Sequence, residues 1–323
     1  MGESFQLGFV RVDCALMTAS YWEERFQSWA SPPGQSEQDR IENAVAAIRK
    51  AMDADVKLAP IAKVYVQGSH RNRVNVRQES DVDIGVLYTG DGFYGQYPEG
   101  TSAETFGYGK HPYKYSEFKE DIAKALVNRF GAGSLHRGDK AFDIHPNSYR
   151  VDADVVPVFE HRRFKTDGTY NSGVQFFADS GEKIINWPEQ LLSGWPRQHY
   201  EEAVAKNDAT KRMFKGVVRI LKKLRVEMEE AGHQSAKDIP GFLIECMVYN
   251  VPNDRLLRPT WDEAVSRAIR NIWTHTKTAE GCTDWIEVSR WKWLFNTSPD
   301  AKRVAAYQFI DEAWGYIGVR KYD

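Results

Sequence analysis

The fold is decided by one stretch, Gln67-Gly-Ser-His-Arg-Asn-Arg-Val-Asn-Val-Arg-Gln-Glu-Ser-Asp81-Val-Asp83-Ile-Gly-Val-Leu87. It follows an alternating, β-branched run, 61–67, which predicts a strand that ends at Gly68. Gly68 lets backbone N–H groups approach a phosphate, and the hydroxyl of Ser69 adds a donor. The stretch therefore predicts a turn that holds a triphosphate.

Two carboxylates begin the next predicted strand, 82–88. Because Asp81 and Asp83 are two residues apart, their side chains leave the same face of that strand. Such a pair repels itself unless a cation lies between the carboxylates, and Mg²⁺ prefers oxygen ligands. The pair predicts two Mg²⁺ ions, for which Mn²⁺ can substitute. One ion activates an attacking hydroxyl, and the other steadies the triphosphate and its pyrophosphate leaving group.

A third carboxylate is expected from a neighbouring strand. The apolar run 149–159 predicts such a strand, and it offers two candidates on one face, Asp152 and Asp154. Only one of them is needed, and the residues alone leave the choice open.

The rest of the chain predicts an α+β protein with two lobes. After an irregular start, residues 1–195 carry predicted helices and strands, and residues 196–323 are mostly helical. The Gly- and Tyr-rich segment 89–114 is long for a connection, so it is either a mobile lid or a partly ordered insertion. Periodicity predicts helices at 37–54, 116–130, 200–207, 209–231, 241–249, 261–277 and 300–314, and strands at 61–67, 82–88, 140–144 and 149–159.

Composition excludes several classes of protein. The 323 residues include 43 basic and 45 acidic side chains, so the formal charge of −2 gives no global basic field for a long nucleic acid. Cys14, Cys246 and Cys282 are far apart and predict neither a zinc site nor a disulfide framework. The sequence has no pattern of a secretory signal or of a membrane span. A cytoplasmic protein with no membrane partner is expected.

These motifs resemble the DNA polymerase beta-type nucleotidyltransferases, whose pattern is Gly-Ser, a turn, Asp-x-Asp and a later Asp. Within that superfamily the chain resembles the bacterial cGAS/DncV-like nucleotidyltransferases, which make cyclic oligonucleotide signals in anti-phage defence. The resemblance implies a bilobal fold in which residues 1–195, with a spine helix, form the catalytic lobe and residues 196–323 close the nucleotide cleft. It selects Asp154, which precedes Val-Val-Pro157, as the third metal ligand and as the candidate general base.

The same resemblance implies further nucleotide-binding residues. Lys222, on a predicted helix, matches a lysine that contacts the donor triphosphate, and Phe242 matches an aromatic that stacks on the base. Gln67 joins them beside Gly68 and Ser69. For Lys222 the alternative is a solvated helix face shared with Lys215, Arg219 and Lys223.

Several positions depart from the family pattern or leave two interpretations open. Val74 stands where the family often has Thr, and Gly241 where Ser is frequent, so some phosphate or ribose contacts must differ. No Cys/His cluster matches the zinc insertion through which the animal relative reads DNA. His70, Arg71 and Arg73 either touch phosphates or are solvated. The tryptophans of 285–295 and 313–318 are expected to pack in the core rather than to bind nucleotide.

The sequence thus predicts a synthase that joins nucleoside triphosphates (ATP, GTP or pyrimidine NTPs) into a cyclic di- or trinucleotide and releases pyrophosphate. The product would be a second messenger for a downstream effector, with no long nucleic acid required. Two alternatives remain: transfer to an RNA end, a protein or a small molecule, and a non-catalytic nucleotide-binding relative. The bases joined, the linkage, the ring size, the activating signal and the oligomeric state are not encoded in any recognisable pattern.

Overall fold

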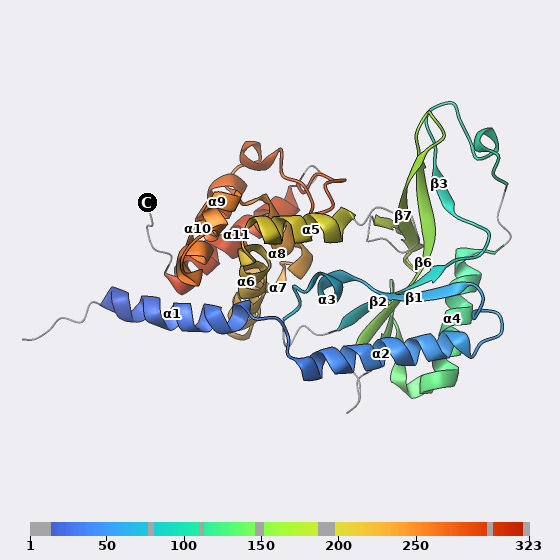
Figure 1. Ribbon diagram of the computed structural model, residues 1–323, viewed down its shortest axis with the longest axis horizontal. Helices are drawn as coiled ribbons and strands as arrows, with labels where there is room; N and C mark the ends of the chain where they lie inside the picture. The colour runs from blue at the N-terminus through green and yellow to red at the C-terminus, as the bar shows by residue number, and fades with distance from the viewer. Residues whose placement is uncertain are drawn as a thin grey trace, which may run out of the picture.

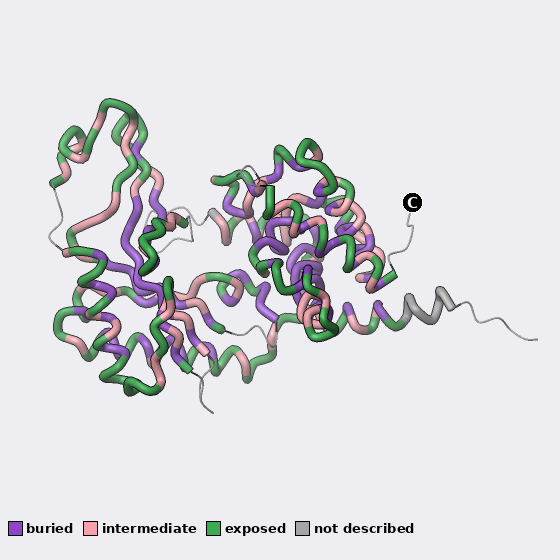
Figure 2. The backbone as a smooth tube through the Cα atoms, turned by 180° about the vertical axis from the view of Figure 1, so that it is seen from behind, coloured by how far each residue is buried: buried purple, intermediate pink, exposed green. Residues whose placement is uncertain are grey.

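The computed structural model describes residues 14–76, 81–109, 113–145, 152–186, 198–295 and 300–318. The chain forms a sheet lobe and a helical lobe that lie side by side (Figure 1). Each lobe has its own hydrophobic core, one between the sheet and the helices that cover it and one among the helices of the second half. In Figure 2 the buried residues, in purple, lie inside each of the two lobes. The architecture is therefore α+β and bilobal, as the sequence predicts.

The sheet is built around one long strand, β6 (Ala153–Phe164). Its first half pairs in parallel with β2 (Val82–Tyr88) and antiparallel with β5 (Phe142–Ile144). Its second half pairs with β3 (Tyr94–Gln96) and β7 (Tyr170–Phe177). The edges are β1 (Ala62–Val66), β4 (Leu135–Arg137) and β8 (Lys183–Asn186), which pair antiparallel with β2, β5 and β7.

The predicted strands at 61–67, 82–88 and 140–144 correspond to β1, β2 and β5. The strand predicted at 149–159 is β6, which begins at Ala153; residues 146–151 lie outside the described part of the chain. Strands β3, β4, β7 and β8 were not predicted. β7 contains Asn171, Ser172 and Gly173, which have low strand propensity, and it is stabilised by its pairing with β6.

Two amphipathic helices cover the sheet. In α2 (Gln35–Asp53) and α4 (Tyr115–Phe130) the apolar side chains recur at three- and four-residue steps and are buried against the strands. Both match the predicted helices. The burial of these two apolar faces fixes the position of the sheet on which the carboxylates lie.

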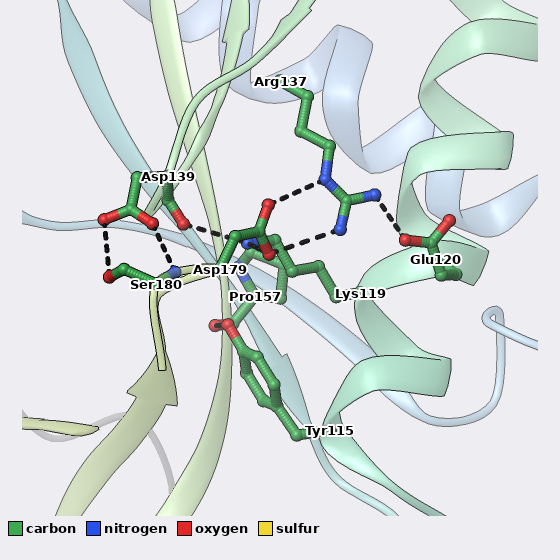
Figure 3. A network of polar contacts seen from close by, with 8 residues as sticks. All are labelled: Tyr115, Lys119, Glu120, Arg137, Asp139, Pro157, Asp179 and Ser180. Carbon is green, nitrogen blue, oxygen red and sulfur yellow. Dashed lines mark hydrogen bonds and ion pairs between the residues drawn. The ribbon is translucent and has the colours of Figure 1, made fainter. Parts of the chain in front are cut away.

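A polar network ties α4 to the hairpins behind the sheet (Figure 3). The ammonium group of the buried Lys119 lies 2.8 Å from Oδ1 of Asp179, and Nε of Arg137 donates to Oδ2 of the same carboxylate at 2.9 Å. The cations of Arg137 and Lys119 hold the pKa of Asp179 down at about 2. Asp139 also accepts a hydrogen bond from the backbone N–H of Ser180 at 2.7 Å. The network holds the β4–β5 hairpin, and therefore β5, against the rest of the lobe.

Residues 14–30 form a helix, which corrects the prediction of an irregular segment for this part of the chain. Helix α1 (Cys14–Ala30) presents Trp22, Phe26 and Trp29 along one face, at positions i, i+4 and i+7. Trp22 and Phe26 are buried in the core of the helical lobe, and Trp29 packs against it. The aromatic stripe therefore makes α1 a part of that core, and Pro32 and Pro33 end the helical run.

The helical lobe confirms the predicted helices of the second half. Helix α6 (Met213–Glu230) passes through its centre and contacts α1, α7 (Gln234–Lys237), α8 (Gly241–Asn250) and α10 (Trp261–Thr276). The remaining helices surround it, and no helix of the described residues has the length and apolarity to cross a bilayer. The other helices of this lobe are α5 (Gln198–Ala209), α9 (Asn253–Leu256) and α11 (Ala301–Ile317).

The Gly- and Tyr-rich segment packs on the far half of β6. It contains β3 and a short 3₁₀ turn, Glu104–Phe106, and its aromatic rings surround Phe164. The guanidinium of Arg162 lies 4.0 Å from the centre of the Phe93 ring. The described residues of the segment thus form an insertion with its own small aromatic core.

Candidate active site

The Gly-Ser turn packs directly against the first carboxylate strand. The short helix α3 (Gly68–Asn72) begins at Gly68, whose φ of +66° is accessible to glycine at little cost. A Cβ atom at Gly68 would lie 2.1 Å from Oδ2 of Asp83. The backbone N–H of Gln67 donates to the carbonyl oxygen of Asp83 at 2.9 Å. The turn and the carboxylate therefore form one unit, in which no side chain fits at position 68.

Strand pairing brings together the carboxylates predicted from the sequence. In the parallel pair of β2 and β6, Asp83 is the register partner of Asp154. In the antiparallel pair of β5 and β6, Asp143 is also the partner of Asp154, so three carboxylates lie in one row across adjacent strands. Asp81 and Asp152 lie at the entries to β2 and β6, next to that row. The sequence analysis did not identify Asp143.

The carboxylates in and beside this row repel one another when they are ionised. Burial, followed by the charges of Asp143, Asp81 and Asp83 and a hydrogen bond with Asp143, raises the pKa of Asp154 to about 7. Burial and the charge of Asp81 raise the pKa of Asp83 to about 6 against the opposing effect of Lys222. Burial, Asp152 and Asp143 raise the pKa of Asp81 as well. These carboxylates cost free energy to ionise together, and a cation would relieve that cost.

Among the described residues, no three acidic, histidine or cysteine side chains already enclose a metal position. Mg²⁺ is commonly bound by one or two carboxylates and completed by substrate phosphates and water rather than by an all-protein cage. An open row of carboxylates beside the Gly-Ser turn fits that mode of binding.

A cavity of about 430 Å³ opens beside this row, between the two lobes. We call it the interlobe cavity. Of Asp81, Asp83 and Asp154, Asp83 lines this cavity and the other two do not. No described residue of the 89–109 insertion lines it either. The interlobe cavity is lined by Gln67, Gly68, Ser69, Asn72, Asp83, Phe176, Asn186, His199, Lys222, Gly241, Phe242, Glu245, Glu287, Ser289 and Lys292.

Lys222 extends from the helical lobe toward Asp83. It is 3% exposed and shares one buried face of α6 with Lys215 and Arg219, which are each 8% exposed. The alternative of a solvated helix face is therefore wrong for these three residues. Burial lowers the pKa of Lys222, while the charges of Glu245 and Asp83 favour its protonated form. Lys222 is thus a buried basic side chain that lines the interlobe cavity beside the Gly-Ser turn.

Phe242 is an apolar side chain that stays open to the cavity. It is 44% exposed, and its ring centre lies 5.9 Å from that of His199. An exposed aromatic face in a cavity offers a surface on which a base can stack. Before it, Gly241 leaves room for Lys222, because a Cβ at position 241 would lie 3.2 Å from Cε of that lysine. A serine at position 241, which is frequent in the family, would therefore be in tight contact with Lys222.

The sequence analysis missed most of the lining contributed by the helical lobe. His199 Nε2 lies 3.2 Å from Oε1 of the buried Glu245. Burial disfavours the Glu245 carboxylate, yet His199, Lys222 and Lys215 hold its pKa below the ordinary value. Glu287, Ser289 and Lys292 approach from the C-terminal segment. Lys292 also donates to the carbonyl of Ile185 in β8 at 2.8 Å, which joins the lobes on this side.

The tryptophans near the C-terminus do not line the interlobe cavity. Trp285 is buried in the helical core, and Trp314 packs against it, which confirms the prediction of core packing for these two. Trp293 is 54% exposed.

The basic residues that follow Ser69 face a different space. His70, Arg71 and Arg73 line a separate cavity behind α3, together with residues of α2. They are absent from the lining of the interlobe cavity, and of the two open interpretations, phosphate contact or solvation, solvation is wrong for His70, which is buried.

A mixed sheet with carboxylates on adjacent strands, a Gly-Ser turn packed against them and a closing helical lobe define a nucleotidyltransferase of the polymerase beta type. The pattern of the cGAS/DncV-like nucleotidyltransferase C-terminal helical domain matches residues 201–318. The chain is 39% identical over 281 residues to the cyclic dipyrimidine nucleotide synthase CdnE of Cecembia lonarensis, covering 86% of this chain and 92% of that protein. It is 37% identical over 303 residues to the enzyme of the same name from Legionella pneumophila, covering 92% and 98%.

A solved structure agrees with these relatives. The CdnE cyclic dinucleotide synthase of Elizabethkingia meningoseptica, determined with GTP and Apcpp, has a TM-score of 0.73 at 32% identity and covers 92% of this chain and 98% of its own. The chain belongs to the bacterial cGAS/DncV-like nucleotidyltransferases. It is an enzyme that joins nucleoside triphosphates into cyclic oligonucleotides. The predicted family, fold and activity are confirmed.

Proposed function

We propose that this enzyme makes a cyclic dinucleotide of pyrimidine bases as a second messenger in anti-phage defence. The observation that carries the choice of bases is the similarity, over nearly their whole lengths, to two cyclic dipyrimidine nucleotide synthases. The defence role rests on the resemblance to bacterial enzymes that make such signals, and it implies a downstream effector that responds to the product.

Residues 1–195 act in this proposal as the catalytic lobe and residues 196–323 as the lobe that closes on the nucleotides. Asp81, Asp83 and Asp154 hold two Mg²⁺ ions, or Mn²⁺ in their place. The pairing of Asp83 with Asp154 and the mutual repulsion of the three carboxylates support this assignment. When bound, the ions supply positive charge at the triphosphate and at the attacking hydroxyl.

The chain's own residues orient the reactants. The backbone at Gly68 and the side chains of Gln67 and Ser69 face the phosphates across the interlobe cavity from Lys222, whose charge offsets that of the triphosphate. Phe242 stacks on a base. This arrangement brings an acceptor hydroxyl in line with the donor phosphate, with pyrophosphate as the leaving group.

Asp154 accepts the proton of the acceptor hydroxyl. Burial and the neighbouring carboxylates raise the pKa of Asp154 to about 7 without a metal, and a bound cation would lower it, so that the ionised carboxylate is available to take a proton near neutral pH. A second transfer within the same cavity then closes the ring.

The test is to incubate the purified enzyme with all four NTPs and Mg²⁺, treat the mixture with phosphatase and identify the resistant products by mass spectrometry. We expect a cyclic pyrimidine dinucleotide that also forms from UTP and CTP alone. Products made of purines alone would refute the choice of bases. A linear tail on added RNA would instead support transfer to another acceptor.

The carboxylate assignment is tested by Asp81→Asn combined with Asp83→Asn, which should abolish pyrophosphate release and leave the fold intact. Asp91→Asn is the control, because this exposed carboxylate lies just beyond β2 and lines no part of the interlobe cavity. Turnover that survives the double substitution would refute the metal assignment.

A further inference from the structure

Glu245 is a buried carboxylate in the wall of the interlobe cavity, and the proposed mechanism gives it no role. It lies in α8 and is 2% exposed. A carboxylate is rarely buried unless nearby charges or hydrogen bonds offset the loss of its hydration. The basic groups that surround Glu245 therefore indicate what its charge does in this cavity.

Three basic side chains surround Glu245 within the helical lobe. Nε2 of His199, in α5, lies 3.2 Å from Oε1 of Glu245. Lys215 and Lys222 share one face of α6, two turns apart, and α6 packs against α8. Burial disfavours the ionised form of Glu245, but the three basic groups together hold its pKa below the ordinary value. Glu245 is thus the anion of a cluster in the helical lobe that includes Lys222.

Lys222 and Glu245 approach the same turn of α8. A Cβ at Gly241 would lie 3.2 Å from Cε and 3.4 Å from Nζ of Lys222, so the end of the lysine runs across the first turn of this helix. Helical side chains point back toward the N-terminus of their helix, so Glu245, one turn later, covers the turn that contains Gly241. The absence of a side chain at Gly241 therefore leaves the space in which the carboxylate and the amine come near each other.

Lys222 lies between two carboxylates of opposite lobes. Burial lowers its pKa, and of the two carboxylate charges that oppose this effect, that of Glu245 is the stronger and that of Asp83 the weaker. Among the described residues, Lys222 forms no direct ion pair with either carboxylate. Asp83 binds Mg²⁺ in the proposed function, so a lysine paired with it would compete with the metal ion. The charge of Glu245 opposes that pairing.

We propose that Glu245 is a positioning residue, which holds the protonated side chain of Lys222 against α8 and away from Asp83. Asp83 then stays open to the metal ion, and Lys222 stays open to the donor triphosphate. The inference rests on the proposed function, in which these two groups bind Mg²⁺ and phosphate. Without the charge of Glu245, Asp83 is the remaining carboxylate that attracts Lys222, and the lysine pairs with it.

The test measures the affinity of the full chain for a non-hydrolysable UTP analogue by calorimetry, at a series of Mg²⁺ concentrations that already saturate the free analogue. Glu245→Gln keeps the shape of the side chain and an acceptor for His199 but removes the charge. We expect the Mg²⁺ concentration that gives half of the maximal effect to rise about tenfold, the size typical of coupling between neighbouring charges. In a Lys222→Met background the same substitution should leave that concentration unchanged.

Glu287→Gln is the matched control. It removes one carboxylate from the lining of the same cavity, and among the described residues Glu287 is not one of the charges that shift the pKa of Lys222. Its Mg²⁺ dependence should match that of the wild type. Equal shifts in Glu245→Gln and Glu287→Gln, or a shift that persists in the Lys222→Met background, would overturn the positioning role.

Glu245→Asp separates the charge of Glu245 from its packing. This variant keeps a carboxylate in a smaller side chain, so it should restore most of the wild-type Mg²⁺ dependence. A shift as large as that of Glu245→Gln, or a loss of affinity that is the same at every Mg²⁺ concentration, would show a packing defect and refute the proposal.

The wild type and Lys222→Met test the proposed function separately. If the affinity of the wild type for the analogue does not depend on Mg²⁺, the metal assignment fails and this inference fails with it. If Lys222→Met binds the analogue as tightly as the wild type at saturating Mg²⁺, the phosphate role of Lys222 fails. A normal wild type and a weakened Lys222→Met, with no shift in Glu245→Gln, would refute the role of Glu245 alone.

Discussion

Replacing Gly68 by alanine tests whether the turn and Asp83 are one unit. The new Cβ would lie 2.1 Å from Oδ2 of Asp83, and contacts below 3.0 Å are essentially never seen for real Cβ atoms. The carboxylate must therefore retreat by at least 3.0 − 2.1 = 0.9 Å, or the turn must move away from β2 by as much. In addition, the φ of +66° at Gly68 is unfavourable for alanine.

Both effects have expected sizes. A non-glycine residue with this backbone conformation costs about 1–2 kcal/mol, and overpacking adds about 1–3 kcal/mol, so the free energy of unfolding should fall by about 2–5 kcal/mol. A displacement of about 1 Å at a reacting centre costs roughly 100-fold in rate. We therefore expect kcat to fall at least about 100-fold. Urea unfolding measures the first quantity, and pyrophosphate release measures the second.

Gly107→Ala separates strain from clash. Gly107 has a φ of +78°, and a Cβ there would meet no atom within 4 Å. This control should lose only the backbone contribution of about 1–2 kcal/mol and keep the wild-type kcat. If Gly68→Ala matches Gly107→Ala in both stability and kcat, the turn does not position Asp83 and the reasoning fails.

Three further predictions follow from contacts at the site. Gly241→Ser brings a Cβ to 3.2 Å from Cε of Lys222, so the KM for NTP measured from initial rates should rise several-fold, while kcat changes little because the ammonium group keeps its charge. Without divalent cations, the free energy of unfolding should fall as the pH rises from about 4 to about 7, since the raised pKa values of Asp83 and Asp154 make the folded chain bind more protons than the unfolded one. Saturating Mg²⁺ should remove that fall. Urea unfolding at each pH measures it, and the same dependence of the unfolding free energy on pH with and without Mg²⁺ would contradict cation binding here. Asp143→Asn removes the largest contribution after burial to the raised pKa of Asp154, so without divalent cations the fall of the unfolding free energy between about pH 4 and about pH 7 should become smaller than in the wild type; an equal fall would contradict the coupling of these two carboxylates.

Much of the fold could be predicted because its elements carry strong local periodicity. Helices α2, α4 and α6 have apolar side chains at helical spacing, and β1 and β2 carry β-branched runs. Helix α1 was missed although Trp22, Phe26 and Trp29 share a face, because the helical core that buries them lies in the second half of the chain. Strand β7 was missed because its stability comes from pairing with β6 rather than from its own residues.

The candidate site, like the fold, has a part that the sequence predicts and a part that it does not. Gly68, Ser69, Asp81 and Asp83 lie within one short segment, so their spacing predicts their neighbourhood. The lining from the opposite lobe has no such local sign: His199 and Glu245 are 46 residues apart and meet only because α5 and α8 both pack on α6. One feature of the sequence could have indicated Asp143: it is a polar residue between two apolar ones, Phe142 and Ile144, on a predicted strand.

The choice between Asp152 and Asp154 depends on the register of two parallel strands, which no single segment encodes. The backbone N–H of Val82 donates to the carbonyl of Asp152 at 2.9 Å, and the register that follows pairs Asp83 with Asp154. A slip of two residues would keep the faces of β6 and put Asp152 beside Asp83 instead. It would also carry Pro157, which has no N–H, and the buried valines of β6 past their present partners. The apolar run after Asp154 therefore fixes the register physically, because its burial against β2 decides which carboxylate stands beside Asp83.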